Sequence, residues 1–229
     1  VKIVFTSAGS PKKWTSWLHD HGVKVAHVVS SSKFALKAEE AGVDAIVAEG
    51  FEAGGHNGRE ETTTMCLIPA VRSVTKLPLM AAGGIATGEA IYAAQALGAD
   101  GVQIGSRFAL SAESSAHPDF KNLCLQLDEG DTKLLLKQLS PTRLVRNKFR
   151  ADVEAAEAAG ADVEALRELL GRGRAKKGMF EGNLDEGELE IGQVVSLFKG
   201  TQIVTVDEIF ADLIEGYRAA ASRMSGNSI

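Results

Sequence analysis

One histidine stands in a glycine-rich stretch that follows a short apolar run. Residues 49–58 read Glu-Gly-Phe-Glu-Ala-Gly-Gly-His-Asn-Gly, with the histidine at position 56 and four glycines in ten residues. Glycine allows positive φ and a close approach of the backbone to a ligand. An imidazole can take a proton near neutral pH or donate a hydrogen bond to a developing anion. We therefore predict that His56 is a catalytic group; the alternative is a structural turn with an incidental exposed histidine.

A second stretch carries two adjacent glycines between a predicted strand and a predicted helix. Residues 81–88 read Ala-Ala-Gly-Gly-Ile-Ala-Thr-Gly, and Thr87 is the expected N-cap, with Glu89 in the first helical turn. Adjacent glycines expose backbone N–H groups that can surround an anion. The spacing matches neither the dinucleotide fingerprint nor a Walker lysine motif. The alternative is a tight turn between strand and helix.

A third stretch, residues 103–108, reads Gln-Ile-Gly-Ser-Arg-Phe. Gly105 and Ser106 can offer two backbone N–H groups and a hydroxyl to a phosphate, while Arg107 either adds charge or pairs with an acid in the core. The second and third stretches follow what we count as the last two strands, where barrels often bind phosphate. Together they predict a phosphorylated cofactor or substrate.

The elements that position these stretches form a repeat in the first half of the chain. Nearly continuous apolar runs at 2–5, 23–29, 45–48, 77–82 and 101–105 predict five parallel strands that are buried on both faces. Helices are expected between them, at 11–21, 32–41, 62–75 and 87–97. Gly42 and Gly98 follow two of these helices directly and act as stop signals. The pattern is typical of an open α/β sheet or of a closed barrel.

The second half of the chain lacks this repeat. We expect residues 1–112 to hold the β/α units and residues 113–229 to form a helical portion, with the clearest helices at 151–170 and 206–224. Five strands are fewer than the eight of a barrel, whose usual length is about 250 residues. The basic residues at 172–177 are interpreted as a solvated loop, and residues 179–199 as an ordered connecting loop.

Composition excludes several classes of protein. The chain has 229 residues, 45% hydrophobic and 24% charged, which is typical of a globular protein. Its net charge of −5 gives no basic excess for binding nucleic acid, and no apolar run approaches the roughly 20 residues of a membrane span. Cys66 and Cys124 are expected as small core residues in a reducing cytoplasm. No histidine has the spacing of a metal ligand. Because the chain starts at Val1, we also expect a numbering that begins inside a longer protein.

The three stretches in this order, with residues 181–193, resemble the nitronate monooxygenase family, also called 2-nitropropane dioxygenases. Flavin-dependent enoyl-acyl-carrier-protein reductases share the fold and motifs of that family. The resemblance implies an α/β fold, a (β/α)₈ TIM barrel with an inserted helical portion, and non-covalently bound FMN. It also implies that residues 1–112 supply about strands 4–8, and that the first three strands of the family have no counterpart here.

The resemblance implies a role for nine residues. His56 would be the catalytic group, Gly54 would lie against the flavin, and Glu49 would contact it. FMN would be held by Glu49, Gly54, Gly83, Gly84, Gln103, Ile104, Gly105 and Ser106, the last six around its phosphate. Position 49 is glutamine in many nitronate monooxygenases and often glutamate in the reductases, so Glu49 favours the reductases.

The expected reaction is oxidation of alkyl nitronates with O₂. His56 would take the α-proton of a nitroalkane or orient the nitronate, with the redox chemistry supplied by the flavin. One alternative is NAD(P)H-dependent reduction of an enoyl thioester on an acidic carrier protein, which residues 172–177 could dock. A second alternative is a flavin-binding protein without catalysis. A homodimer is expected at the level of the family.

Overall fold

The computed structural model describes residues 1–226 and divides into two compact units. The first, which we call the β/α unit, comprises Val1–Phe51, Glu60–Ile104 and, of the described residues, Leu213–Gly226. The second unit comprises Glu52–Arg59 and Gly105–Asp212. The chain therefore passes between the units within two of the three stretches singled out above, at Phe51–Glu52 and at Ile104–Gly105.

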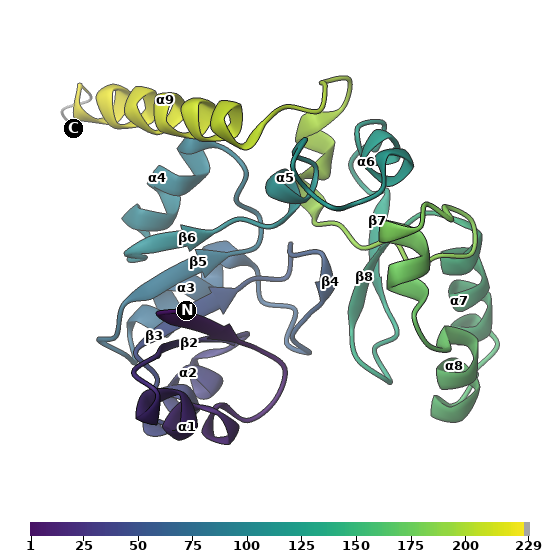
Figure 1. Ribbon diagram of the computed structural model, residues 1–229, viewed down its shortest axis with the longest axis horizontal. Coiled ribbons are helices and arrows are strands. Elements are labelled where there is room, and N and C mark those ends of the chain that lie inside the picture. The colour runs from purple at the N-terminus through teal and green to yellow at the C-terminus, as the bar shows by residue number, and fades with distance from the viewer. Residues whose placement is uncertain (227–229) are drawn as a thin grey trace. The chain divides into compact units, whose positions relative to one another are not determined.

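The β/α unit is built on a five-stranded parallel sheet (Figure 1). Its strands, in spatial order, are β1 (Ile3–Thr6), β2 (Lys24–Val29), β3 (Ala45–Glu49), β5 (Leu79–Ala82) and β6 (Gly101–Gln103). The helices of the unit are η1 (Pro11–Lys13), α1 (Thr15–Asp20), α2 (Ser32–Glu40), α3 (Thr64–Arg72), α4 (Gly88–Ala96) and most of α9 (Val206–Ser225). The five predicted strands and the helices between them are confirmed. The sheet curls without closing on itself and forms the expected part of a barrel.

The two faces of this sheet differ in what covers them. On one face, Val25, Ile46 and Leu79 pack in the main core against apolar residues of α1–α4. On the other face lies a small cluster centred on Ala26, Val47 and Ala82. Because side chains alternate along a strand, every second residue of β3 and β5 points to this second face, where Val28 and Met80 pack against the cluster.

The helix boundaries follow the local chemistry that the sequence predicts. Thr87 is the N-cap of α4, and its side chain accepts a hydrogen bond from the N–H of Ala90 at 3.2 Å. Gly42 and Gly98 adopt φ of +82° and +108° after α2 and α4, a conformation that other residues rarely adopt. The thiol of Cys124 is buried, as expected, whereas Cys66 is exposed on α3, which corrects the prediction that both cysteines lie in a core.

Helix α9 packs on α4 through two glycines. A Cβ added to Gly88 would lie 2.0 Å from the backbone nitrogen of Tyr217 and 2.4 Å from the carbonyl carbon of Gly216. The Tyr217 hydroxyl donates a hydrogen bond to Gln95 Oε1 at 2.6 Å. The predicted helix over 206–224 is therefore confirmed, and a glycine on α4 allows its close approach.

The second unit contains a sheet that the sequence did not predict. Its three antiparallel strands have the order β4 (Gly55–His56), β8 (Thr142–Val145) and β7 (Thr132–Leu135). Its helices are α5 (Ser106–Ala109), α6 (Pro118–Cys124), α7 (Lys148–Ala158), α8 (Val163–Leu170), the π-helix η2 (Lys176–Phe180) and the 3₁₀-helix η3 (Gln193–Phe198). The strands escaped prediction because they have at most four residues, and β4 pairs with a partner far away in the chain.

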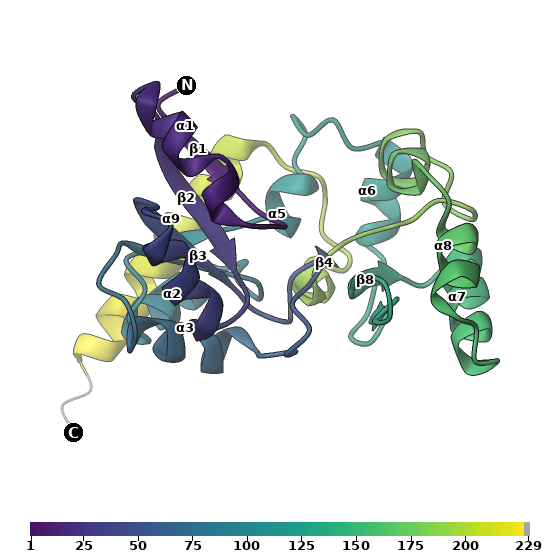
Figure 2. The same ribbon diagram turned by 90° about the horizontal axis from the view of Figure 1, so that it is seen from below.

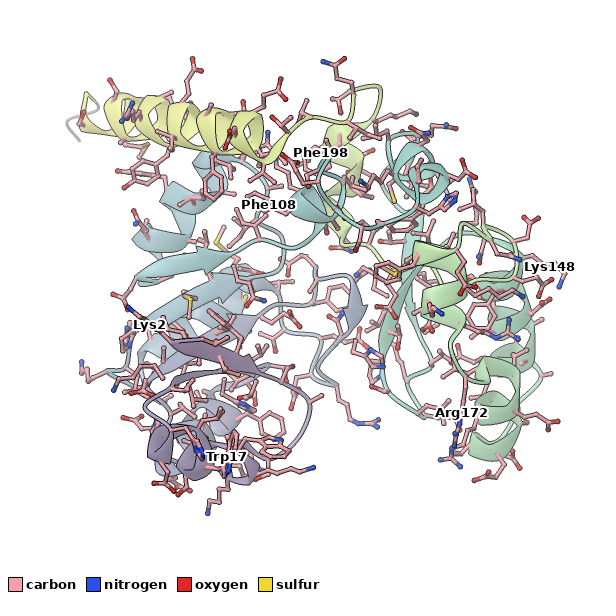
Figure 3. All side chains as sticks on the ribbon, viewed as in Figure 1. Lys2, Trp17, Phe108, Lys148, Arg172 and Phe198 are labelled. Atoms are coloured by element: carbon pink, nitrogen blue, oxygen red, sulfur yellow. The ribbon has the colours of Figure 1, made fainter. Side chains whose placement is uncertain are left out.

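Two further expectations for the second unit need correction. The helix expected over 151–170 is two helices that lie side by side (Figure 2). Gly160 adopts a φ of +78° between them, and Asp162 caps α8 by accepting a hydrogen bond from the N–H of Ala165. The basic stretch is not uniformly solvated, since Arg174 donates hydrogen bonds to backbone carbonyls and lies 4.6 Å from the Phe149 ring centroid. Arg172 remains at the surface of the unit (Figure 3).

Within residues 1–226, no helix is both long and apolar enough to cross a bilayer.

Candidate active site

Three strand ends of the β/α unit are aligned in one register. Glu49 of β3 lies opposite Ala82 of β5, and Ala82 lies opposite Gln103 of β6. Residues in register on parallel strands point to the same face. Glu49 and Gln103 therefore both point to the face of the small-residue cluster, with the methyl group of Ala82 between them. The carboxyl ends of parallel strands are where α/β folds place their chemistry.

The carboxyl group of Glu49 differs from an ordinary surface carboxylate. Burial raises its pKa from 4.5 to about 7, because an ionised carboxylate loses hydration there. Near neutral pH a large part of the population keeps the proton. In that form Glu49 can donate a hydrogen bond as well as accept one, as a glutamine amide can.

The glycine pair after β5 forms a turn that only glycine adopts without strain. Gly83 and Gly84 have φ of +82° and +71°. A Cβ on Gly83 would lie 2.7 Å from the carbonyl oxygen of Gly50. The Thr64 hydroxyl donates a hydrogen bond to the Gly83 carbonyl at 2.8 Å, and Gly50 N–H donates to the Ala82 carbonyl at 2.9 Å. The turn is thus held against the end of β3.

The residues after β6 begin the second unit. Gly105 is the N-cap of the short helix α5, and a Cβ on it would meet no heavy atom of the described residues within 4 Å. Ser106 Oγ accepts a hydrogen bond from the N–H of Gly192 at 3.0 Å. Arg107 forms an ion pair with Asp212. Arg107 pairs with an acid, as one alternative predicted, but Asp212 is exposed and does not lie in a core.

The segment that carries His56 runs along residues 190–193 of the second unit. Gln193 N–H donates a hydrogen bond to the Glu52 carbonyl at 2.9 Å. A Cβ on Gly54 would lie 2.5 Å from the carbonyl carbon of Ile191. The protein's own backbone therefore requires glycine at position 54. His56 ends this segment in β4, opposite Thr142 of β8, and is exposed.

Two glutamates beside this segment were not among the predicted site residues. Glu190 forms a bridge with Leu144 of β8, and its Oε2 lies 2.4 Å from where a Cβ on Gly55 would be. Burial raises the pKa of the Glu188 carboxyl, and the charge of Glu190 raises it further, to about 7. The signal in the sequence is the alternation Glu188-Leu189-Glu190-Ile191, whose two apolar members are buried in a core.

The structure thus places the predicted site residues in two groups. The β/α unit brings together five of them at one edge of its sheet: Glu49, Gly83, Gly84, Gln103 and Ile104. The second unit holds the other four: Gly54, His56, Gly105 and Ser106.

Comparison with known proteins identifies the family. The nitronate monooxygenase family model matches residues 1–216. A protein of Bacillus subtilis (strain 168) described as a probable nitronate monooxygenase is 32% identical over 219 residues, which are 92% of this chain and 62% of that protein. The chain therefore spans less than two thirds of the length of this relative.

Two solved structures are similar to the chain. FabK from Thermotoga maritima is 35% identical with a TM-score of 0.92, over 99% of this chain and 71% of that one. A nitroalkane oxidase from Streptomyces ansochromogenes is 26% identical with a TM-score of 0.78, over 98% and 66% of the two chains. Together with the family model, which covers nearly the whole sequence, these findings show that the chain belongs to the nitronate monooxygenase family.

Proposed function

We propose that this protein is an FMN-dependent oxidoreductase that oxidises alkyl nitronates with O₂. The observation that carries the proposal is the register of Glu49, Ala82 and Gln103, which puts two polar side chains and the Gly83–Gly84 turn at one sheet edge. Membership of the nitronate monooxygenase family supports the same reaction class.

The residues present fit a flavin mononucleotide. A phosphate needs backbone N–H groups, and the positive φ of Gly83 and Gly84 in the β/α unit suits that need. Ile104 and Ser106 flank Gly105, and the Ser106 hydroxyl hydrogen is not used in the bond that its oxygen accepts from Gly192. The Gln103 amide can donate a hydrogen bond to the phosphate, and the protonated form of Glu49 can donate to and accept from the polar edge of a flavin ring. Gly54 would offer its backbone to the ring.

His56 supplies the acid–base chemistry of the proposed reaction. Its neutral imidazole takes the α-proton of a nitroalkane, or its protonated form donates a hydrogen bond to the nitronate oxygen. When bound, FMN supplies an acceptor for the substrate's electrons and a route for them to O₂. The short strand β4 holds the histidine in place through its pairing with β8.

Reduction of an enoyl thioester with NAD(P)H is the second candidate, and Glu49 is the observation that favours it. The resemblance associates glutamate at this position with the reductases more often than with the monooxygenases. An acidic carrier protein would then use exposed cations such as Arg172 (Figure 3). Arg174 is less available, because its guanidinium donates hydrogen bonds to the carbonyls of Leu170 and Glu186.

A visible absorption spectrum tests the proposal. The chain is incubated with FMN, freed of excess cofactor by gel filtration, and mixed without air with either a nitronate or NAD(P)H. Bleaching of the flavin bands by nitronate, and their return with O₂, is the expected result. Bleaching by NAD(P)H alone would favour the reductase, and a chain that retains no FMN would contradict both.

His56→Ala separates an enzyme from a flavin-binding protein without catalysis. An enzyme should keep FMN and lose turnover, whereas His21→Ala, which replaces an exposed histidine of the β/α unit, should change neither. Turnover of His56→Ala at the wild-type rate would contradict the role of His56.

A further inference from the structure

The strand that carries His56 cannot fix its own register. β4 consists of Gly55 and His56 alone, and the stretch around it is rich in glycine. Register is weakly specified in glycine-rich strands, and a slip by one residue moves every side chain to the other face of the sheet. Gly55 is buried and His56 is exposed, so such a slip would turn the imidazole away from the exposed face. Contacts outside β4 must therefore hold the register.

Arg143 of β8 provides a contact on the N-terminal side of β4. It lies opposite Gly55, where β4 runs beside β8 (Figure 1). Its Nε donates a hydrogen bond to the Ala53 carbonyl at 3.1 Å, and its Nη1 donates one to the Thr132 hydroxyl of β7 at 3.5 Å. Arg143 is only 1% exposed, and a buried cation is costly even when its donors find partners, so an apolar side chain would fill this position at lower cost. The guanidinium therefore indicates a role that packing alone does not explain.

Contacts on the C-terminal side of β4 hold the segment to the same hairpin. The N–H of Asn57 donates a hydrogen bond to the Pro141 carbonyl at 2.8 Å. The guanidinium of Arg59 donates hydrogen bonds to two carbonyls in the loop between β7 and β8, at 2.7 Å to Lys137 and at 2.9 Å to Leu139. The buried arginine of β8 thus reaches from the hairpin to the segment, whereas Arg59 reaches from the segment to the hairpin. Together these contacts hold the short strand on both sides.

We propose that Arg143 and Arg59 fix the register of β4 on the β7–β8 hairpin and so keep the imidazole of His56 on the exposed face, which makes both arginines positioning residues. The inference rests on the proposed function, in which His56 takes the α-proton of a nitroalkane. In that step the substrate C–H bond breaks, its electron pair stays with the carbon and nitro group, and the proton forms an N–H bond on His56. The base must lie within hydrogen-bonding reach of that proton, and a misplacement of about 1 Å can lower the rate about a hundredfold.

Amide hydrogen exchange of the full chain tests the register without any cofactor. Arg59→Ala should speed exchange of the Asn57 N–H about tenfold, because it releases one side of the strand and local opening sets the rate. Arg143→Lys should do the same, because an ammonium does not reproduce the fixed fork of a guanidinium. The N–H of Val145 in β8, which is also hydrogen-bonded, is the reference and should keep its rate. An Asn57 rate that either substitution leaves unchanged, or an equal acceleration at Val145, would overturn the proposal.

Two features of the design keep this test sharp. Arg59 is exposed, so Arg59→Ala should fold even if a substitution of the buried Arg143 does not. The matched control is Arg167→Ala, which removes another exposed arginine of the second unit whose ion-pair partner, Glu164, lies on its own helix. This control should leave both exchange rates at their wild-type values.

Kinetics of the flavin-loaded chain test the role in the reaction. Arg59→Ala and Arg143→Lys should each lower kcat about tenfold with the flavin content unchanged, and Arg167→Ala should keep the wild-type kcat. In a chain that already carries His56→Ala, the same two substitutions should cause no further loss, because no imidazole remains to be positioned. An unchanged kcat, or a further loss in that background, would overturn the positioning role. A wild-type chain that binds FMN but turns over no substrate would overturn the proposed function instead, and the exchange rates would still decide whether the arginines hold β4.

Discussion

Replacement of Glu49 by glutamine should change how the stability of the protein depends on pH. Burial holds the pKa of Glu49 at about 7 instead of 4.5. A folded-state pKa above the unfolded value means that the contribution to stability is complete below pH 4.5 and is lost as the pH rises through 7. At about 1.4 kcal/mol per pKa unit, the full loss is up to about 3 kcal/mol. Glu49→Gln keeps the shape and hydrogen-bonding capacity of the protonated carboxyl and has no charge to desolvate.

The assay is urea unfolding of the wild type and of Glu49→Gln at pH 5 and pH 8. At pH 5, just above the unfolded pKa, the variant should be more stable by only about 1 kcal/mol, and at pH 8 it should be more stable by up to about 3 kcal/mol. The difference between the two proteins is the quantity to compare, because Glu188 and Glu190 also have raised pKa values and affect both alike. Glu129→Gln, at an exposed position, is the control and should show no such difference. Parallel pH dependence of wild type and Glu49→Gln would refute the reasoning, since it would mean that Glu49 ionises without loss of hydration.

Two more substitutions test the glycines. Gly84→Ala and Gly22→Ala impose the same left-handed strain, because both glycines have a φ of +71°. Each substitution should lower the free energy of unfolding by about 1–2 kcal/mol. Only Gly84→Ala should weaken FMN binding in a flavin fluorescence titration. Equal FMN affinity in both variants would exclude the Gly83–Gly84 turn from the cofactor site. Gly88→Ala should destabilise the β/α unit by about 2–3 kcal/mol, because its methyl group would lie 2.0 Å from a backbone atom of α9. Gly216→Ala, whose nearest contact would be 3.3 Å, should cost less in thermal unfolding, and a larger loss there would contradict the packing described.

The repeat of strand and helix in the first half was predictable because each unit is specified locally. The residues of β2 and β3 are mostly apolar. This composition is typical of strands that are covered on both faces. Thr87 and Gly98 mark the start and end of α4 with chemistry that needs no distant partner. For the same reason, the sequence predicted that Glu49 and Gln103 lie near the ends of strands. That their side chains point to the same face follows only from the register between the strands.

The second unit could not be predicted in this way because its structure depends on distant partners. The strand β4 has two residues and exists only because Gly55 and His56 pair with Arg143 and Thr142. From the sequence, Arg107 could add charge to a phosphate site or pair with an acid. The acid that it pairs with, Asp212, lies far along the chain. The resemblance assigns Gly54 to the flavin, but the backbone of Ile191 also leaves no space for a side chain at position 54. No local pattern in the sequence could tell which of these two causes requires the glycine.

Glu188 and Glu190 show most clearly what a sequence alone leaves open. Among several acids between residues 179 and 199, nothing in composition distinguishes these two from solvated surface charges. Their alternation with Leu189 and Ile191 fixes which side they face only once the apolar pair is known to lie in a core. Burial then raises the pKa of both carboxyls, and the bridge between Glu190 and Leu144 fixes the segment to β8. The raised pKa values are therefore a property of the fold of the second unit, and a change in β8 that displaced residues 189–191 should lower them toward that of an exposed glutamate.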